Sequence, residues 1–100
     1  MAKIGGAKLE YNSVVYYLYI LTCADHTLYT GITTDLKKRV SEHNSGKEGA
    51  KYTRSRLPVR LSYSIEYADR AEASSAEYKM KQLSREAKLA LIKESKKKKV

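Results

Sequence analysis

The sequence has no tryptophan, no phenylalanine, one cysteine and one proline among its 100 residues. Because Cys23 is alone, a disulfide framework and a zinc site built from several thiolates are excluded. No stretch is long and apolar enough to span a bilayer, and residues 1–13 lack the apolar core of a signal peptide. We therefore expect a soluble, cytoplasmic protein with no membrane partner.

Several common functional motifs are also absent. The chain has no phosphate-binding P-loop, no GxGxxG dinucleotide fingerprint and no serine nucleophile elbow. His26 and His43 lack the spacing of a zinc pair, and neither a zinc-finger pattern nor the aromatic motifs of an RNA-recognition domain appear. None of these motifs therefore offers a persuasive competing site.

Acidic residues are scarce, since 11 Asp and Glu face 20 Lys and Arg for a net charge of +9. Lys96–Lys99 supply four of these charges, and a terminal lysine run is typically a solvated end. Residues 37–60 contain only Glu42 and Glu48 against eight cations, which are Lys37, Lys38, Arg39, Lys47, Lys51, Arg54, Arg56 and Arg60. This cluster favours a polyanionic partner, nucleic acid and above all DNA. Solubility alone is the alternative explanation.

Hydrophobic periodicity predicts one small domain in the order β-β-α-β-α-α. The run VVYYLYIL (14–21) is typical of a central strand, and LYTGI (28–32) follows as the second strand of a hairpin. VRLSYSIEY (59–67) alternates, which predicts a half-buried strand with one apolar face made by Val59, Leu61, Tyr63, Ile65 and Tyr67. We expect a mixed α/β (α+β) domain with a three-stranded, at least partly antiparallel sheet and flanking helices.

Cap and stop signals place the helices and the domain boundaries. The first helix follows a Thr or Asp cap and ends at residues 44–46, and a basic loop occupies residues 47–58. Asp69 caps the second helix, and Ser84 caps a third that runs into the lysines. The predicted domain covers residues 13–93, between a flexible lead-in (1–12) and a flexible lysine-rich tail (94–100).

Three charged or polar side chains fall on the inward stripes of the predicted helices. Arg39 and His43 follow Leu36 at helical spacing, and Glu77 lies between Ala73 and Met80. Burying an unpaired carboxylate costs several kcal/mol, so Glu77 needs a partner. One explanation is a structural Arg39–Glu77 ion pair or an edge-of-core position. The other is a site in which Glu77 holds a divalent cation and Arg39 faces a phosphate.

The tyrosines extend this possible site onto the sheet. Tyr17 and Tyr19 share a face of the first strand. A hairpin centred on Asp25 pairs Tyr19 with Gly31, which places Tyr19 and Tyr29 diagonally on one face, whereas a shift of half a residue separates them. Gly31 then leaves an open position where a substrate backbone could approach. Ordinary strand packing remains the alternative for each tyrosine.

The motifs YLY (17–19), YTG (29–31) and LKKRVSEH (36–43), followed by EASSAEYKMKQL (72–83), resemble the signature of the GIY-YIG endonuclease superfamily. The resemblance covers nearly the whole predicted domain and is strongest to the small stand-alone GIY-YIG proteins of bacteria. Tyr17 stands where the first family motif has its glycine.

This resemblance implies a phosphodiesterase that uses one divalent cation, Mg²⁺ or Mn²⁺. Tyr19 and Tyr29 would be the motif tyrosines, one helping to activate water and the other positioning the water or the phosphate. Arg39 would stabilise charge on the phosphate, His43 could relay a proton, and Glu77 would be the metal ligand. A tyrosine with the ordinary pKa of about 10 needs such neighbours to act as a base at neutral pH.

The predicted function is a metal-dependent DNA endonuclease with low sequence preference. Its nucleic-acid contacts would come from exposed or site-lining residues, namely Tyr17, Gly31, Lys37, Lys38, Lys47, Lys51, Arg54 and Arg56. We expect a monomer or weak homodimer, with specificity supplied by a protein partner if there is one. The alternatives are a non-catalytic nucleic-acid-binding module of the same fold and a basic RNA- or ribosome-associated protein in which Arg39 and Glu77 are structural.

Overall fold

The computed structural model describes residues 14–98 and contains one antiparallel sheet. Strands β2 (Tyr16–Thr22), β3 (Leu28–Thr33) and β4 (Arg60–Tyr67) lie in the order β3-β2-β4. The central strand β2 pairs antiparallel with both neighbours. The predicted mixed α+β class and the three-stranded sheet are therefore confirmed, and the sheet is antiparallel throughout. The lead-in predicted for residues 1–12 lies outside the described residues.

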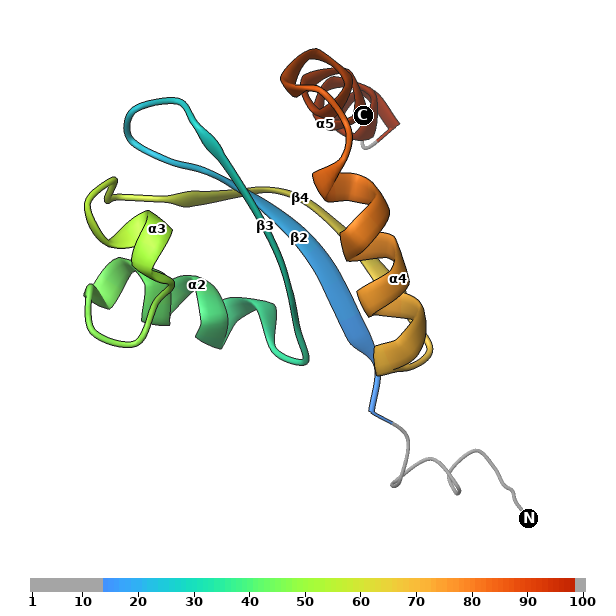
Figure 1. Cartoon of the computed structure of the whole chain (residues 1–100), viewed down its shortest axis with the longest axis horizontal. Helices are drawn as coiled ribbons and strands as arrows, with labels where there is room; N and C mark the ends of the chain where they lie inside the picture. Colours follow the sequence, from blue (N-terminus) through green and yellow to red (C-terminus); the bar gives the residue numbers. More distant parts are fainter. Residues whose placement is uncertain (1–13, 99–100) are drawn as a thin grey trace.

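Helices cover both faces of this sheet (Figure 1). Helices α2 (Leu36–Ser45) and α3 (Lys51–Arg54) lie on one side, and α4 (Arg70–Lys81) and α5 (Arg85–Lys98) on the other. The predicted caps are confirmed: side chains of Asp35, Asp69 and Ser84 each accept a backbone N–H of the helix that follows. Gly46 ends α2 in the left-handed conformation, with φ of 76°.

The strand β2 is buried on both faces because alternate side chains enter two different cores. Leu18 and Ile20 pack with Met80 and Ile92 on the side of α4 and α5. Tyr19 and Leu21 pack with a second cluster on the side of α2 and α3 that includes Cys23 and Val59. The apolar run in the sequence is therefore continuous because β2 contributes side chains to the cores on both faces of the sheet.

A bulge in β4 corrects the predicted apolar face of that strand. Ile20 pairs with Tyr63, but Leu21 pairs with Leu61, so Ser62 is the extra residue. Val59 consequently packs in the cluster on the side of α2, whereas Tyr63 and Tyr67 pack against the cluster beneath α4. The perfect alternation of residues 59–67 correctly predicts a strand but wrongly predicts one shared face.

The predicted loop over residues 47–58 differs from the structure. Residues 47–58 are not all loop, because they contain the single turn of α3. Helix α5 reaches Lys98, so the predicted run of the last helix into the lysines extends through residues 94–98. Within residues 14–98, no helix is long and apolar enough to cross a membrane.

Candidate active site

The β2–β3 hairpin has the register that the sequence predicts. Tyr19 pairs with Gly31 and Leu21 with Tyr29, so the rings of Tyr19 and Tyr29 lie on the same face with centroids 6.4 Å apart. The predicted open position beside Gly31 is wrong, because the ring of Tyr19 fills it. A Cβ at Gly31 would lie 2.6 Å from Tyr19 Oη. Gly31 therefore lets the Tyr19 hydroxyl extend over the edge strand β3.

We predict that Gly31→Ala disrupts this arrangement. The added Cβ would also lie 2.8 Å from Tyr19 Cζ, and the ring is only 1% exposed, so it has little room to move. Overpacking of this kind costs about 1–3 kcal/mol, measurable as a lower free energy of unfolding in urea. In a double-mutant cycle, Tyr19→Phe should reduce the cost by removing the closest atom. An equal cost in both backgrounds would contradict the predicted clash.

The inward stripe of α2 brings His43 and Arg39 to the same place. His43 is fully buried, and its Nε2 lies 3.0 Å from Tyr19 Oη. Arg39 is partly exposed and donates from Nη1 to Glu42 Oε1 and to the Glu48 carbonyl, both at 2.9 Å. The alternative of an Arg39–Glu77 ion pair is not found, since Arg39 pairs with Glu42.

The other nitrogen of His43 contacts α3, which the sequence did not predict as a helix. Nδ1 lies 2.8 Å from Thr53 Oγ1 and accepts the Ala50 N–H at 3.4 Å. Thr53 is as deeply buried as His43. Sequence reasoning missed Thr53 because nothing in the local pattern of residues 47–58 marks an inward-facing hydroxyl.

Burial dominates the electrostatics of this pair. It lowers the pKa of His43 below the ordinary 6.5, and the positive charge of Arg39 acts in the same direction while Glu42 opposes it. The imidazole is therefore neutral near pH 7. Burial raises the pKa of the Tyr19 hydroxyl above 10.0; Arg39 opposes this rise, and Tyr29 and Glu77 add to it. Arg39 and Glu77 thus act on one hydroxyl from two different helices.

A cluster of aromatic rings forms the wall of the site next to α3. Tyr29 packs edge-on to His43 at 5.2 Å and stacks with Tyr52 at 6.0 Å between centroids. The Arg56 guanidinium lies 4.0 Å above the centroid of Tyr52 and bonds Asp25 from Nε at 3.1 Å. These contacts connect the hairpin tip to α3. Arg56, a predicted nucleic-acid contact, is already paired within the protein.

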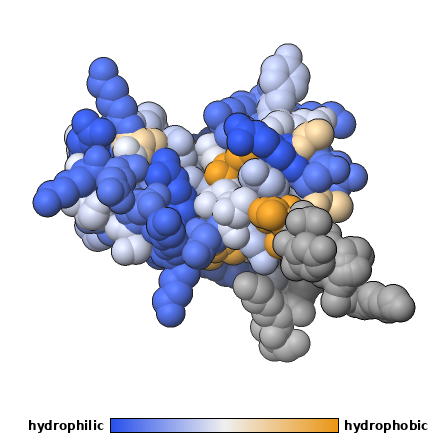
Figure 2. All heavy atoms as spheres, turned by 90° about the horizontal axis from the view of Figure 1, so that it is seen from below, coloured by the Kyte–Doolittle hydropathy of each residue, from blue (hydrophilic) through white to orange (hydrophobic). Residues whose placement is uncertain are grey.

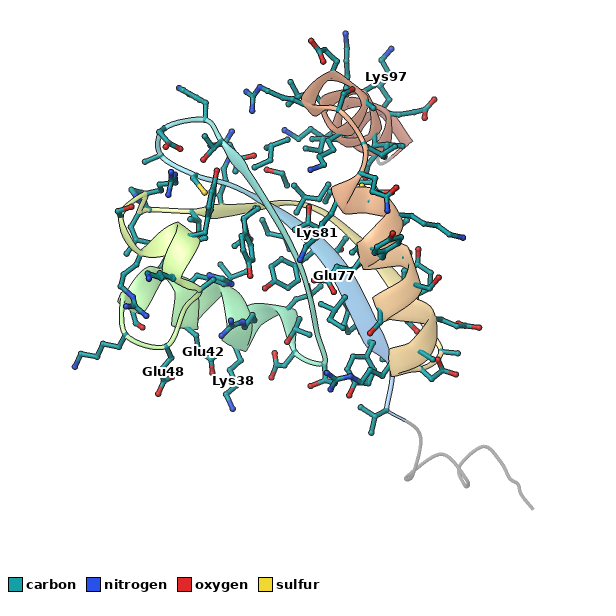
Figure 3. All side chains as sticks on the ribbon, viewed as in Figure 1. Lys38, Glu42, Glu48, Glu77, Lys81 and Lys97 are labelled. Atoms are coloured by element: carbon teal, nitrogen blue, oxygen red, sulfur yellow. The ribbon has the colours of Figure 1, made fainter. Side chains whose placement is uncertain are left out.

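Glu77 approaches from α4, on the other side of the sheet. The helix packs on β3, and Figure 3 shows Glu77 and Lys81 directed from α4 toward the sheet. The Glu77 side chain is 24% exposed, and its carboxylate pairs with the Lys81 Nζ at 3.2 Å. Because β3 is an edge strand and the Tyr19 hydroxyl lies over it, Glu77 is close enough for its charge to act on that hydroxyl.

A divalent cation at this site would have the Glu77 carboxylate, a hard oxygen donor, as its protein ligand. Within residues 14–98, no group of three or more His, Cys, Asp or Glu side chains could form a complete protein cage. Mg²⁺ is commonly held by one or two carboxylates together with water and substrate phosphates, so Glu77 alone meets the protein's share. Lys81 is 55% exposed and is easily displaced from the carboxylate.

Most of the residues predicted to contact nucleic acid are exposed cations on the side of the molecule where α2 and α3 lie. Figure 2 shows hydrophilic side chains over the part of the surface where α2 and α3 lie. The exposed members are Lys37, Lys38, Lys47, Lys51 and Arg54. A polar hollow of about 300 Å³ lies beside Arg39 and is lined by Thr33, Thr34, Asp35, Lys38, Arg39 and Glu42. Tyr17 is half-buried on the strand face that carries Tyr19.

Four of the five predicted catalytic side chains, those of Tyr19, Tyr29, Arg39 and His43, thus lie on one face of the sheet, whereas Glu77 lies on α4 and acts on the Tyr19 hydroxyl through its charge. The arrangement can place a positive charge, a hydroxyl and a carboxylate around a phosphodiester group. Gly31 was also predicted to offer a nucleic-acid backbone an open position on the sheet. It does not, because it is buried beneath the Tyr19 ring.

Comparisons with known proteins place the chain among known relatives. Residues 15–90 match the profile of the GIY-YIG catalytic domain. A UPF0213 protein of Desulfotalea psychrophila is 52% identical over 88% of this chain and 80% of its own, and one of Streptococcus agalactiae is 56% identical over 80% and 90%. The solution NMR structure of a UPF0213 protein from Bacillus halodurans is similar, with a TM-score of 0.51 and 47% identity over 79% of this chain and 83% of that one. The names of these relatives state no activity.

Proposed function

Because this chain belongs to the GIY-YIG catalytic domain family, a family of nucleases, we propose that it is a metal-dependent endonuclease that hydrolyses phosphodiester bonds in DNA with low sequence preference. The observation that carries the proposal is the buried Tyr19–His43 hydrogen bond, on whose hydroxyl Arg39 and Glu77 both act.

Hydrolysis of a phosphodiester requires a positioned water and a positive field on the phosphate oxygens. Arg39 supplies the field: Nη1 is held by Glu42 and the Glu48 carbonyl, which leaves the other guanidinium donors for a phosphate. Tyr19, oriented by His43, is the tyrosine that helps to activate the attacking water. Tyr29 packs against His43 and lines the same face, where it positions the water or the phosphate.

Glu77 would hold the cation, Mg²⁺ or Mn²⁺, which supplies charge neutralisation at the phosphate when bound. The Glu77 side chain is directed from α4 toward the sheet, and a bound cation would compete with Lys81 for its carboxylate. The protein's own contribution would therefore be a single anionic ligand on α4, whose charge acts on the Tyr19 hydroxyl.

DNA binding would come from the exposed cations of α2, α3 and the segment between them. Lysine and arginine contacts to phosphates position a duplex but carry no sequence information, which is why low sequence preference is expected. A monomer or weak homodimer suffices for such a site, and a protein partner could add specificity.

The test is to titrate Mg²⁺ and Mn²⁺ into the protein with end-labelled duplex, single-stranded and branched DNA, and with RNA of matched sequence. We expect binding that weakens as salt rises and strand cleavage that needs the cation. Binding without cleavage on every substrate would favour the non-catalytic module. Metal-independent binding that prefers RNA would favour the RNA-associated alternative.

A further inference from the structure

The surroundings of His43 determine which of its ring nitrogens carries the proton. Nε2 faces Tyr19 Oη at 3.0 Å, and Nδ1 faces Thr53 Oγ1 at 2.8 Å and the Ala50 N–H at 3.4 Å. Both nitrogens have polar partners, so a flipped ring would put carbon atoms against these groups. The neutral imidazole has one N–H and one acceptor nitrogen.

The backbone N–H of Ala50 distinguishes the two tautomers. A hydroxyl proton can rotate, and the Thr53 hydroxyl could donate to Nδ1 or to the Ala50 carbonyl 3.0 Å away. The Ala50 N–H cannot rotate, because the chain fixes its direction, and it points at Nδ1. Only an unprotonated Nδ1 can accept it. We infer that the α3 cap, through Ala50 and Thr53, keeps Nδ1 bare, so that the protonated Nε2 of His43 donates to Tyr19 Oη.

The close approach of residues 49–50 to α2 depends on a glycine. A Cβ at Gly49 would lie 2.5 Å from His43 Cα and 3.2 Å from Nδ1. Any side chain at Gly49 would therefore force the segment away from α2 and separate the Ala50 N–H from His43. The same local packing that makes α3 possible sets the tautomer.

This assignment changes the part that His43 plays in the reaction, a step that rests on the proposed function. A nitrogen that already carries a proton cannot take one from Tyr19, so His43 is a hydrogen-bond donor rather than a proton relay. The proton of Tyr19 then points away from His43, and a donor at the oxygen stabilises its deprotonated form. Thr53 is a positioning residue, because it acts on Tyr19 only through His43.

The other groups that face His43 are compatible with a neutral ring. Arg39 and Glu42 come from its own helix, Tyr19 from β2 and Tyr29 from β3, while α3 presents the uncharged Thr53. Of these, only Glu42 favours the protonated imidazole, and burial outweighs it.

The direct test is a long-range ¹H–¹⁵N NMR spectrum of the uniformly ¹⁵N-labelled protein at pH 7.5. We expect His43 Nε2 to show the shift of a protonated nitrogen and Nδ1 that of an unprotonated one; the reverse pattern would overturn the inference. Thr53→Val should move the ¹⁵N chemical shift of His43 Nδ1 toward the value of a nitrogen that accepts fewer hydrogen bonds. Thr53→Ser should restore the wild-type chemical shift. An unchanged Nδ1 shift in Thr53→Val would remove Thr53 from the mechanism. This measurement needs no substrate, so it remains decisive if the proposed function fails.

The activity test separates donation from proton acceptance. The amide of His43→Gln can donate where Nε2 does but cannot take a proton at neutral pH, whereas His43→Leu can do neither. We expect His43→Gln to cleave DNA at least about tenfold faster than His43→Leu, corresponding to the loss of about one hydrogen bond to a charged group. Equal loss in both variants would contradict the donor role.

Discussion

Glu77→Gln should lower the rate of metal-dependent cleavage by about a thousandfold, because charge stabilisation by a bound cation is worth several kcal/mol. The variant keeps the shape of the side chain and removes the only carboxylate whose charge acts on the Tyr19 hydroxyl from α4. Folding should be nearly unchanged, since the Glu77–Lys81 pair is a partly exposed i,i+4 pair. DNA affinity should be equal or slightly higher, because one negative charge is lost.

A matched control is Glu94→Gln, which removes the same charge from an exposed position on α5. Single-turnover cleavage rates at saturating protein, measured over a range of Mg²⁺ concentrations, distinguish a loss of metal affinity from a loss of the chemical step. A Glu77→Gln protein that cleaves as fast as Glu94→Gln would show that Glu77 does not hold the cation.

Arg39→Ala should reduce cleavage about 10²–10³-fold, the effect of removing one donor aimed at developing negative charge. Arg39→Lys should recover only part of the rate, because an ammonium group lacks the planar fork that binds two phosphate oxygens. The Tyr19 hydroxyl should also become harder to ionise, since Arg39 opposes the rise of its pKa.

Arg70→Ala serves as the control for charge, because Arg70 is exposed at the start of α4. Both variants lose one positive charge, so a comparable decrease in DNA affinity is expected from long-range electrostatics. The cleavage rate of bound DNA should fall only in Arg39→Ala. Equal rates for bound DNA in the two variants would mean that Arg39 does not act on the scissile phosphate.

Local patterns were sufficient to predict the hairpin and the α2 stripe. The pairing of Tyr19 with Gly31 follows from a turn centred on Asp25, and period-two geometry then puts Tyr19 and Tyr29 on one face. Helical spacing placed Arg39 and His43 together because i, i+4 side chains share a line along a helix. Both results depend on periodicities that a single segment carries by itself.

The errors arise where separate segments determine the outcome. The bulge at Ser62 lets residues of β4 and the adjoining Val59 pack into both cores. The sequence of β4 alone does not indicate this bulge. Helix α3 has only four residues and no side-chain cap, so its intrinsic helix propensity is too weak to form it alone. It is stabilised instead by tertiary contacts such as that between Thr53 and His43. The filled space over Gly31 depends on the direction of the Tyr19 ring from a neighbouring strand.

The most direct test of the central claim is a nicking assay on supercoiled plasmid, with highly purified wild-type, Glu77→Gln and Arg39→Ala proteins in Mg²⁺, Mn²⁺ or EDTA. The account predicts that the wild-type protein converts the plasmid to open-circular and linear forms only with the cation. Both variants should bind the plasmid and leave it supercoiled. Wild-type cleavage no faster than that of both variants, or equally fast in EDTA, would contradict a metal-dependent nuclease built on Arg39 and Glu77.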